Sequence, residues 1–332
     1  MSPNAGFAWK PKNWTTQRVF SPDVSVLMNK TNRKLLIVKK VRAQTAHPTD
    51  PRPIEVRALG SLPSCNRVVK HLLYIAPDPN LENGTILFQY YPLGDLADWK
   101  TKNFDNKNNK PVPESYIWRC LVHIGQAVAF LQNKLGPYRD TRQCLLHRDI
   151  KPKNILVVDN GSTYPSFKLH DFDCAFIYNK AKAEQPSRCG TYTWQPPENP
   201  MINTKAADIW ALGACIHYLA TGHAPLANIA TYAAGRFQEQ NQHPKSAGEY
   251  ETPDCYYYAR VPRRVDAINV GNLQYSDELN GWMMKCLNHD PKKRPRAEKL
   301  VEDMWTTATE ILKLSGGNSA LIDLDAKFGD DA

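Results

Sequence analysis

The chain lacks any run of about 18 apolar residues, the length that a membrane-spanning helix needs. Its first fourteen residues, MSPNAGFAWKPKNW, also lack the apolar stretch of a secretory signal peptide. We therefore expect a soluble, intracellular protein, cytoplasmic or nuclear, with no membrane partner.

Closely spaced cysteine pairs of the form C-x-x-C are also absent. This absence argues against a zinc cluster and against a small disulfide scaffold. We expect free thiols, either buried or at the surface. The eight cysteines are Cys65, Cys120, Cys144, Cys174, Cys189, Cys215, Cys255 and Cys286.

What the chain does contain is enough apolar material to fold. With 332 residues and 42% hydrophobic composition, it can bury the core of one large fold or of two lobes. Lys and Arg number 42 against 33 for Asp and Glu, a formal charge of +9, which favours acidic partners in general. The basic residues are dispersed and no RNA or DNA motif accompanies them, so we do not expect nucleic-acid binding.

The first ninety residues have the pattern of a sheet. Residues 34–41 (KLLIVKKV) and 85–91 (TILFQYY) are short, apolar and rich in β-branched or aromatic side chains, as in strands. The polar stretch 100–110 (KTKNFDNKNNK) is expected to be a surface loop.

The rest of the chain has helical periodicity. One amphipathic helix is expected after Pro113 and Glu114, and a second, apolar nearly all round, over 206–221 with its end at Gly222. Residues 277–314 are again helical in pattern, with a break at Asp290-Pro291, and the last residues (IDLDAKFGDDA) are expected to form an acidic, weakly ordered tail.

The stretch most specific for a function is HRDIKPKN, His147 to Asn154, followed by the apolar run Ile155 to Val158. It closely resembles the catalytic loop of eukaryotic protein kinases, including the strand that follows that loop. The resemblance implies that Asp149 holds the attacking hydroxyl in line with the γ-phosphate of ATP and that Asn154 binds a Mg²⁺ ion. Lys151 would add positive charge at the transferred phosphoryl group and is similar to the lysine of the serine/threonine branch.

A second match follows at Lys168 to Asp173, KLHDFD, which resembles the Asp-Phe-Gly motif of the same family. Asp171 would bind the magnesium that bridges the β- and γ-phosphates, and Phe172 would pack beneath the small-lobe helix. Asp173 stands where the family has glycine, so a position that usually allows positive φ is lost there.

The segment Gly190 to Glu198, GTYTWQPPE, resembles the end of the kinase activation segment, where the peptide substrate binds. In this resemblance Thr191 shapes the acceptor site with Lys151, and Glu198 pairs with the buried Arg294. Asp208 resembles the helix aspartate whose carboxylate accepts backbone N–H groups of the catalytic loop.

In the small lobe Lys39 resembles the strand lysine that contacts the α- and β-phosphates, although Lys40 beside it is an alternative. Strand alternation favours Lys39, because Ile37 and Val41 share its face. Glu55 is the acid expected to pair with this lysine, and an ordinary exposed helix glutamate is the alternative interpretation.

Other nucleotide contacts are carried over from the family position by position. Phe88, Gln89 and Tyr91 resemble the linker whose backbone binds adenine, Asp95 the acid that reaches the ribose, and Val24 the valine after the glycine-rich loop.

That glycine-rich loop is missing. No glycine occurs between Gly6 and Gly60, and the three places that glycine usually takes fall on Gln17, Val19 and Pro22. A loop whose backbone N–H groups approach phosphate closely is therefore absent or rebuilt, which puts nucleotide affinity in doubt.

Ser187, three residues before Gly190, is a candidate site of activating phosphorylation by an upstream kinase. Arg148 would receive that phosphate, and His147 is expected to have a structural or regulatory role. An unmodified exposed serine is the alternative.

Together these motifs predict an α+β, bilobal protein-kinase-like fold, with a small antiparallel β-sheet lobe containing one helix and a larger, mainly helical lobe. We expect an N-terminal extension (1–14), a kinase domain (15–312, lobes about 15–91 and 92–312) and the acidic tail (313–332). The predicted function is ATP- and Mg²⁺-dependent phosphorylation of serine or threonine in proteins. A pseudokinase scaffold is the main alternative, and a small-molecule phosphotransferase of related fold is a second.

Overall fold

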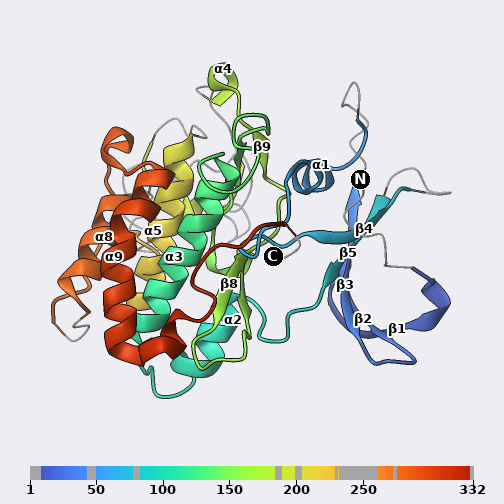
Figure 1. Ribbon diagram of the computed structural model, residues 1–332, viewed down its shortest axis with the longest axis horizontal. Coiled ribbons are helices and arrows are strands. Elements are labelled where there is room, and N and C mark those ends of the chain that lie inside the picture. Colours follow the sequence, from blue (N-terminus) through green and yellow to red (C-terminus); the bar gives the residue numbers. More distant parts are fainter. Residues whose placement is uncertain are drawn as a thin grey trace.

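The computed structural model describes residues 9–42, 50–77, 83–183, 189–198, 204–228, 231, 261–271 and 275–329. The chain forms two lobes: an antiparallel sheet with one short helix, and a larger group of packed helices (Figure 1). The predicted α+β, bilobal architecture is therefore confirmed.

The small lobe is a five-stranded antiparallel sheet in the order β1-β2-β3-β5-β4, accompanied by helix α1. The predicted strands over 34–41 and 85–91 correspond to β3 and β5, which pair from Leu36 opposite Gln89 to Arg42 opposite Asn83. The elements are β1 (Trp14–Ser21), β2 (Val24–Asn29), β3 (Leu35–Arg42), α1 (Ile54–Ser61), β4 (His71–Ile75) and β5 (Asn83–Gln89).

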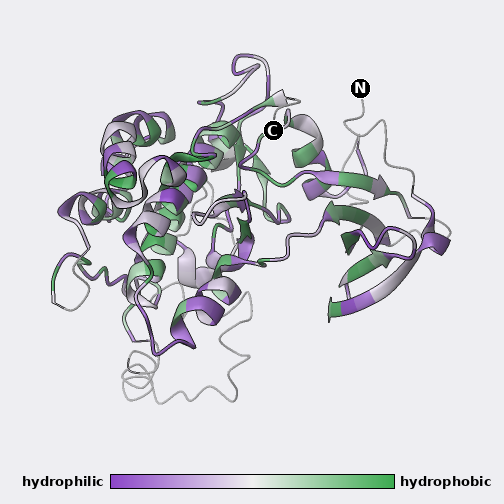
Figure 2. Cartoon of the chain, turned by 60° about the horizontal axis from the view of Figure 1, so that its bottom comes forward, coloured by the Kyte–Doolittle hydropathy of each residue, from purple (hydrophilic) through white to green (hydrophobic). Residues whose placement is uncertain are grey.

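The larger lobe is built around α3 and α5, whose side chains are buried on almost every face. Both predicted helices are confirmed, and α5 ends at Gly222 in the left-handed conformation (φ 88°). The helices are α2 (Leu96–Lys100), α3 (Glu114–Leu131), α4 (Lys180–Ala183), α5 (Lys205–Thr221), α8 (Asp277–Cys286) and α9 (Ala297–Gly316). Figure 2 shows the hydrophobic colouring concentrated on the helix faces that meet inside this lobe.

Short strands and turns connect these helices. Two-stranded ladders join β6 (Leu145–Leu146) to β9 (Phe176–Ile177) and β7 (Ile155–Val158) to β8 (Ser166–Leu169). Further turns in the described residues are η3 (Pro152–Asn154), η4 (Tyr192–Trp194) and η6 (Pro291–Lys293), while η1 (Pro11–Asn13) precedes β1 in the small lobe. In the described ranges no helix combines the length and apolar character needed to cross a bilayer.

The surface loop predicted for 100–110 is wrong in its first half. Helix α2 ends at Lys100 and continues directly into a π-helical turn, η2 (Thr101–Asp105). Phe104 is 6% exposed and lies edge-on to Trp99, with ring centroids 5.2 Å apart. The polar composition of the stretch conceals this one aromatic anchor, and burying it orders the turn.

The prediction of a weakly ordered acidic tail is also wrong. Helix α9 runs on to Gly316, a turn η7 (Gly317–Leu321) follows, and the chain then returns towards α1 and β4 (Figure 1). Leu324 is 2% exposed, and the Phe328 ring stacks on Phe130 with centroids 5.6 Å apart. These apolar contacts fix the segment despite its acidic residues.

A buried arginine explains why that segment is acidic. Arg67 follows α1, is 0% exposed, and donates to the Asp323 carboxylate at 3.1 Å and to the Asp325 carbonyl at 2.7 Å. Gln126 of α3 accepts a further bond from its Nε at 2.9 Å. Residues 322–329, hereafter the C-terminal strap, thus supply the negative charge that compensates Arg67, which lies between α1 and β4.

Burial also affects histidines of the larger lobe. His123 of α3 is 0% exposed, and its Nδ1 accepts the Phe167 N–H at 3.1 Å. Burial, followed by the nearby charges of Arg67 and Arg119, lowers the pKa of His123 well below its usual value. The folded protein therefore holds His123 neutral.

This neutral histidine predicts a pH effect on stability. The unfolded chain protonates His123 near pH 6.5, whereas the folded chain does not, so its contribution is complete above that pH and declines as the pH falls. In His123→Asn the amide oxygen can still accept the Phe167 N–H, but nothing titrates at this position. We expect the difference in unfolding temperature between wild type and variant to shrink from pH 7 to pH 5; a constant difference would contradict this.

Candidate active site

The loop after β6 is held in shape by the side chains of Asp208 in α5 and of His147 in the loop itself. Asp208 of α5, 1% exposed, accepts the backbone N–H groups of His147 and Arg148, each at 2.9 Å, so the predicted contact is present. His147 accepts the Asp149 N–H through Nδ1, which leaves Nε2 to donate to the His170 carbonyl at 3.0 Å. The strained backbone of Arg148 (φ 70°) is stabilised between these contacts.

The carboxylate of Asp149 is the centre of this loop and is only 8% exposed. One oxygen accepts the Thr191 N–H at 2.8 Å. The other accepts Lys151 Nζ at 2.8 Å and Asn154 Nδ2 at 3.1 Å. Lys151 also donates to the Thr191 hydroxyl at 2.7 Å. The four side chains expected around an acceptor hydroxyl are therefore in mutual contact.

Gly190 allows Thr191 to reach this centre. Its φ is +88°, and a Cβ atom there would lie 2.2 Å from the Arg148 carbonyl oxygen, which is backbone and cannot move aside. Gln195 also ties this segment to Arg148, because its side-chain amide donates to the Arg148 carbonyl at 2.9 Å. Sequence reasoning named Gly190 only as part of a motif and missed Gln195.

The small lobe brings a lysine to the same region. Lys39 Nζ lies 2.8 Å from Glu55, 2.7 Å from Asp171 and 2.8 Å from Asp173. The expected contact between Lys39 and Glu55 is thus present, while the role of Lys39 at the α- and β-phosphates stays a prediction. The contact with Asp173 was not predicted. It places a third carboxylate on one ammonium group.

These charges set the protonation states. Burial disfavours the charged form of Lys39, but Glu55, Asp171 and Asp173 outweigh it and raise its pKa. Burial raises the pKa of Glu55, and Lys39 offsets this only in part. For Asp171 the effect of Lys39 exceeds that of burial, so its pKa is lowered. Lys39 is firmly cationic and Asp171 anionic.

Glu55 also links α1 to the motif at Asp171. Its second oxygen accepts the Phe172 N–H at 3.0 Å, and Phe172 is 0% exposed in the same core as Leu59 of α1. Phe172 is therefore buried and tied to the small-lobe helix through Glu55. Asp173 does not use positive φ in this arrangement, whereas Asp171 does (φ 64°).

Asn154 and Asp171 have the chemistry of a site for a hard cation. Asn154 donates its amide N–H₂ to the carbonyl and the carboxylate of Asp149, which turns its amide oxygen away from them. The backbone bond from His170 N–H to the Asn154 carbonyl, 3.0 Å long, ties the two residues together. Two oxygen donors, one of them anionic, suit Mg²⁺.

The strand connection expected to cover phosphates is a tight turn. Strands β1 and β2 are joined by Pro22 and Asp23 alone, and the Ser21 hydroxyl accepts the N–H groups of Asp23 and Val24 at 3.3 and 3.1 Å. Those N–H groups are the ones that a phosphate could otherwise use. The absence of glycine thus corresponds to a rebuilt turn. Val24 lies opposite Lys39 in the sheet.

The residues expected to contact adenine and ribose lie near the connection between the two lobes. Phe88 and Gln89 end β5, and Tyr91 follows, where burial raises its pKa to about 12. Asp95 accepts the Asp98 N–H at 2.9 Å and so caps α2. A capping role explains Asp95 without any ligand, and its ribose contact stays a prediction.

Two further predictions concern the activation segment, residues 171–198. Glu198 and Arg294 form the expected pair, with two bonds of 2.8 Å and an Arg294 side chain that is 0% exposed. Ser187 lies outside the described residues, so its phosphorylation stays a prediction.

A pocket of about 430 Å³ lies away from these residues, between η2, the start of α3 and the β7–β8 connection. It is lined by Trp99, Phe104 and Tyr116 with Lys107 and Lys110 at its edge, and none of the residues around Asp149 or Lys39 contributes to it.

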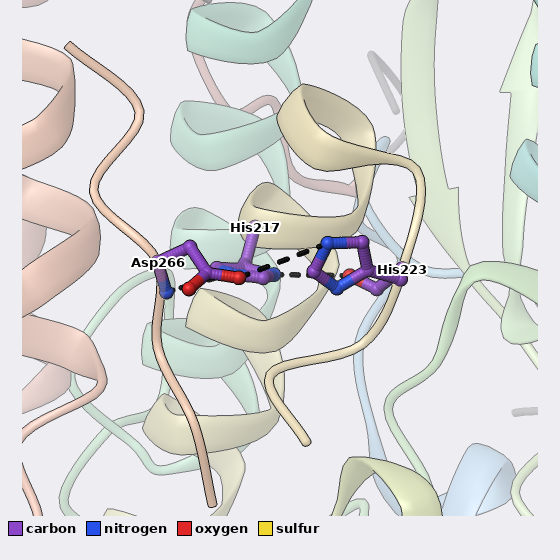
Figure 3. A group of neighbouring side chains, drawn as sticks. All are labelled: His217, His223 and Asp266. Carbon is purple, nitrogen blue, oxygen red and sulfur yellow. Dashed lines mark hydrogen bonds and ion pairs between the residues drawn. The ribbon is translucent and has the colours of Figure 1, made fainter. Parts of the chain in front are cut away.

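A cluster of His217, His223 and Asp266 has metal-ligand chemistry but not the geometry (Figure 3). His217 Nε2 accepts the Asp266 N–H at 3.1 Å, and its Nδ1 donates to the His223 carbonyl at 2.9 Å. With both ring nitrogens already bonded to backbone, His217 fastens the end of α5 to residues 261–271.

Comparisons with known proteins agree with this geometry. The family model described as protein kinase domain matches residues 21–306. Over 211 residues the chain is 28% identical to dual specificity mitogen-activated protein kinase kinase 7 of Mus musculus, covering 61% of this chain and 33% of that protein. It is 27% identical over 225 residues to mitogen-activated protein kinase kinase 2 of Arabidopsis thaliana, covering 67% and 52%.

Human serine/threonine-protein kinase Nek2 is 26% identical over 221 residues, covering 66% of this chain and 42% of that protein. The chain therefore spans between a third and about half the length of these curated relatives. Since the family model covers most of the chain and the motif residues meet in space as the family requires, this chain belongs to the protein kinase domain family.

Proposed function

We propose that the chain is an active, intracellular serine/threonine protein kinase that transfers the γ-phosphoryl group of MgATP to protein hydroxyls. The observation that supports this most is the arrangement around Asp149. Its carboxylate is held by Lys151, Asn154 and Thr191 while Lys39 is paired with Glu55. A scaffold without catalysis has no chemical need for both arrangements together.

In this mechanism Asp149 orients the acceptor hydroxyl and takes up its proton as the new P–O bond forms, while the bond between the γ-phosphorus and the β–γ bridging oxygen breaks and ADP leaves. Lys151, which bridges the carboxylate and the Thr191 hydroxyl, places positive charge beside the acceptor. When ATP binds, Lys39 gives up some of its contacts with Glu55, Asp171 and Asp173 and instead holds the α- and β-phosphates. Mg²⁺ bound by Asn154 and Asp171 would neutralise charge on the β- and γ-phosphates.

Serine or threonine is the proposed acceptor because of the Lys151–Thr191 bridge. The names of two relatives describe dual specificity or mitogen-activated kinase kinases, so a tyrosine acceptor is the second candidate. We further propose protein substrates and an upstream kinase that acts on the activation segment.

Transfer of labelled phosphate tests the proposal. The chain is incubated with labelled ATP and Mg²⁺, and separately with EDTA, using generic Ser/Thr and Tyr peptides. We expect Mg²⁺-dependent labelling of Ser or Thr. No transfer together with no thermal shift on adding MgATP would favour the scaffold, and labelling of small molecules alone would favour the related phosphotransferase.

The Asp173 carboxylate predicts an unusual limit on nucleotide affinity. It occupies Lys39 and adds negative charge where phosphates would bind, although it is 53% exposed and therefore partly screened. We expect Asp173→Asn to tighten MgATP binding by roughly 3- to 10-fold, an effect measurable by calorimetric titration.

Asp173→Gly separates charge from backbone freedom. If charge is the cause, Asn and Gly should tighten binding alike. Tighter binding in the glycine variant alone would assign the effect to the backbone, and weaker binding in both would mean that Asp173 assists the nucleotide rather than competing with it.

A further inference from the structure

Two cysteines stand at the two ends of the activation loop, which we define as residues 174–189. Cys174 directly follows Asp173, and Cys189 directly precedes Gly190. Both are half-buried, and Cys189 Sγ lies 3.9 Å from the Cys174 carbonyl oxygen. Each thiol is close enough to shift the pKa of the other. The fold thus brings together two sulfur atoms that the proposed phosphate transfer does not use.

Their surroundings give the two thiols different roles. The hydrogen bond from Cys174 and, against the effect of burial, the Arg148 guanidinium lower the pKa of Cys189 to about 6. The same hydrogen bond and burial raise the pKa of Cys174. Negative charge therefore resides on Cys189, and Cys174 remains a neutral thiol beside it. A thiolate next to a resolving thiol is the arrangement found at peroxide-reactive sites.

We propose that Cys189 and Cys174 are a peroxide-sensitive pair that closes to a disulfide across the activation loop. In the first step the Cys189 thiolate attacks one oxygen of hydrogen peroxide. The S–O bond forms, the O–O bond breaks, and hydroxide leaves as water after taking a proton, so that Cys189 becomes a sulfenic acid.

In the second step the sulfur of Cys174 attacks the sulfur of Cys189. The S–S bond forms and the S–O bond breaks, while the Cys174 proton leaves with the hydroxide as water. Two thiols together lose two electrons, and one peroxide is reduced to two waters.

The cross-link would act where the loop joins the site. Asp173 beside Cys174 contacts Lys39, and Gly190 beside Cys189 packs on the Arg148 carbonyl. Closing the disulfide also removes a negative charge from Arg148, the residue expected to receive a phosphate on Ser187. Oxidation of the cysteine pair and phosphorylation of Ser187 would therefore both change the charge beside the Arg148 guanidinium.

Peptide mass spectrometry of the full chain tests the pair directly. Reduced protein is exposed to graded hydrogen peroxide, blocked with an alkylating agent and digested without reductant. We expect a Cys174–Cys189 peptide to be the first cross-link to form and to disappear with dithiothreitol. Its absence while other thiols oxidise, or equal cross-linking to other cysteines, would overturn the proposal.

The order of the steps is tested by trapping sulfenic acid with dimedone. Cys174→Ser should accumulate the adduct on Cys189, whereas Cys189→Ser should give none on Cys174. Cys144→Ser, which changes another half-buried cysteine, should leave the disulfide intact. An adduct on Cys174 in the Cys189→Ser variant would contradict the assigned roles.

Alkylation of the wild type needs no variant. At pH 7 a thiol of pKa about 6 is mostly thiolate, against a few per cent for an ordinary thiol, although its lower basicity makes each thiolate less nucleophilic. We expect iodoacetamide to label Cys189 roughly tenfold faster than Cys144 at pH 7, and equal rates would overturn the proposal. None of these measurements depends on phosphate transfer, so each stands if the proposed kinase activity fails.

Discussion

Replacing Asp149 by Asn is expected to lower kcat/KM for phosphate transfer by about 10²- to 10⁴-fold. The amide has nearly the same shape as the carboxylate and can still accept from Lys151 or Thr191, which lie 2.8 Å from the two oxygens. It cannot take up the proton of the acceptor hydroxyl. The measurement is the initial rate of labelled phosphate transfer to the peptide that wild type prefers.

Asp140→Asn is the matched control, because Asp140 is exposed and contacts none of the site residues named above. It should keep the wild-type rate, and both variants should unfold within a few degrees of wild type. An Asp149→Asn protein that retains more than a tenth of the activity would remove Asp149 from the proposed mechanism.

The second large effect concerns stability. Asp323→Ala should cost about 3 kcal/mol of unfolding free energy, the lower end of the usual cost of breaking a buried pair. The variant leaves Arg67, which is 0% exposed, without its carboxylate, although neutral oxygens such as the Gln126 amide still accept from it. Thermal unfolding should shift down by roughly 5–10 °C.

Asp325→Ala is the control within the same segment. Only the backbone carbonyl of Asp325 accepts from Arg67, and that carbonyl survives the substitution. Its unfolding temperature should fall much less than that of Asp323→Ala, because the Asp325 carboxylate acts on Arg67 only through space. Arg67→Met combined with Asp323→Leu should cost less than the two single changes summed, since neither partner is then left buried alone. If Asp323→Ala and Asp325→Ala lose equal amounts of unfolding free energy, the stabilisation comes from general surface charge and not from the Arg67–Asp323 pair.

The proposed catalytic centre could be predicted from the sequence because its residues lie in short runs with fixed spacing. Asp149, Lys151 and Asn154 share one loop, and the strand after them confirms its context. The choice between Lys39 and Lys40 followed from the alternation of a strand, which holds wherever one face of the sheet is covered.

Contacts between distant segments could not be predicted in the same way. The position of Asp173 beside Lys39 depends on how the two lobes meet, and no local pattern encodes that. Arg67 and Asp323 are 256 positions apart, and each looks like an ordinary surface charge in its own neighbourhood. The helical turn over 101–105 was missed because one buried aromatic, Phe104, outweighs the polar residues around it.

The separation of Arg67 from the C-terminal strap has a consequence during synthesis. At the usual 5–20 residues per second, roughly 10–50 s pass between the incorporation of Arg67 and that of its carboxylate partner. During this interval the Arg67 guanidinium, in the connection after α1, has no Asp323 carboxylate to compensate its charge on burial. It therefore has to stay in contact with water. The contact of Arg67 with α3 and the C-terminal strap is thus among the last parts to consolidate, and a ribosome-bound chain stopped before Asp323 should be cleaved by proteases near Arg67.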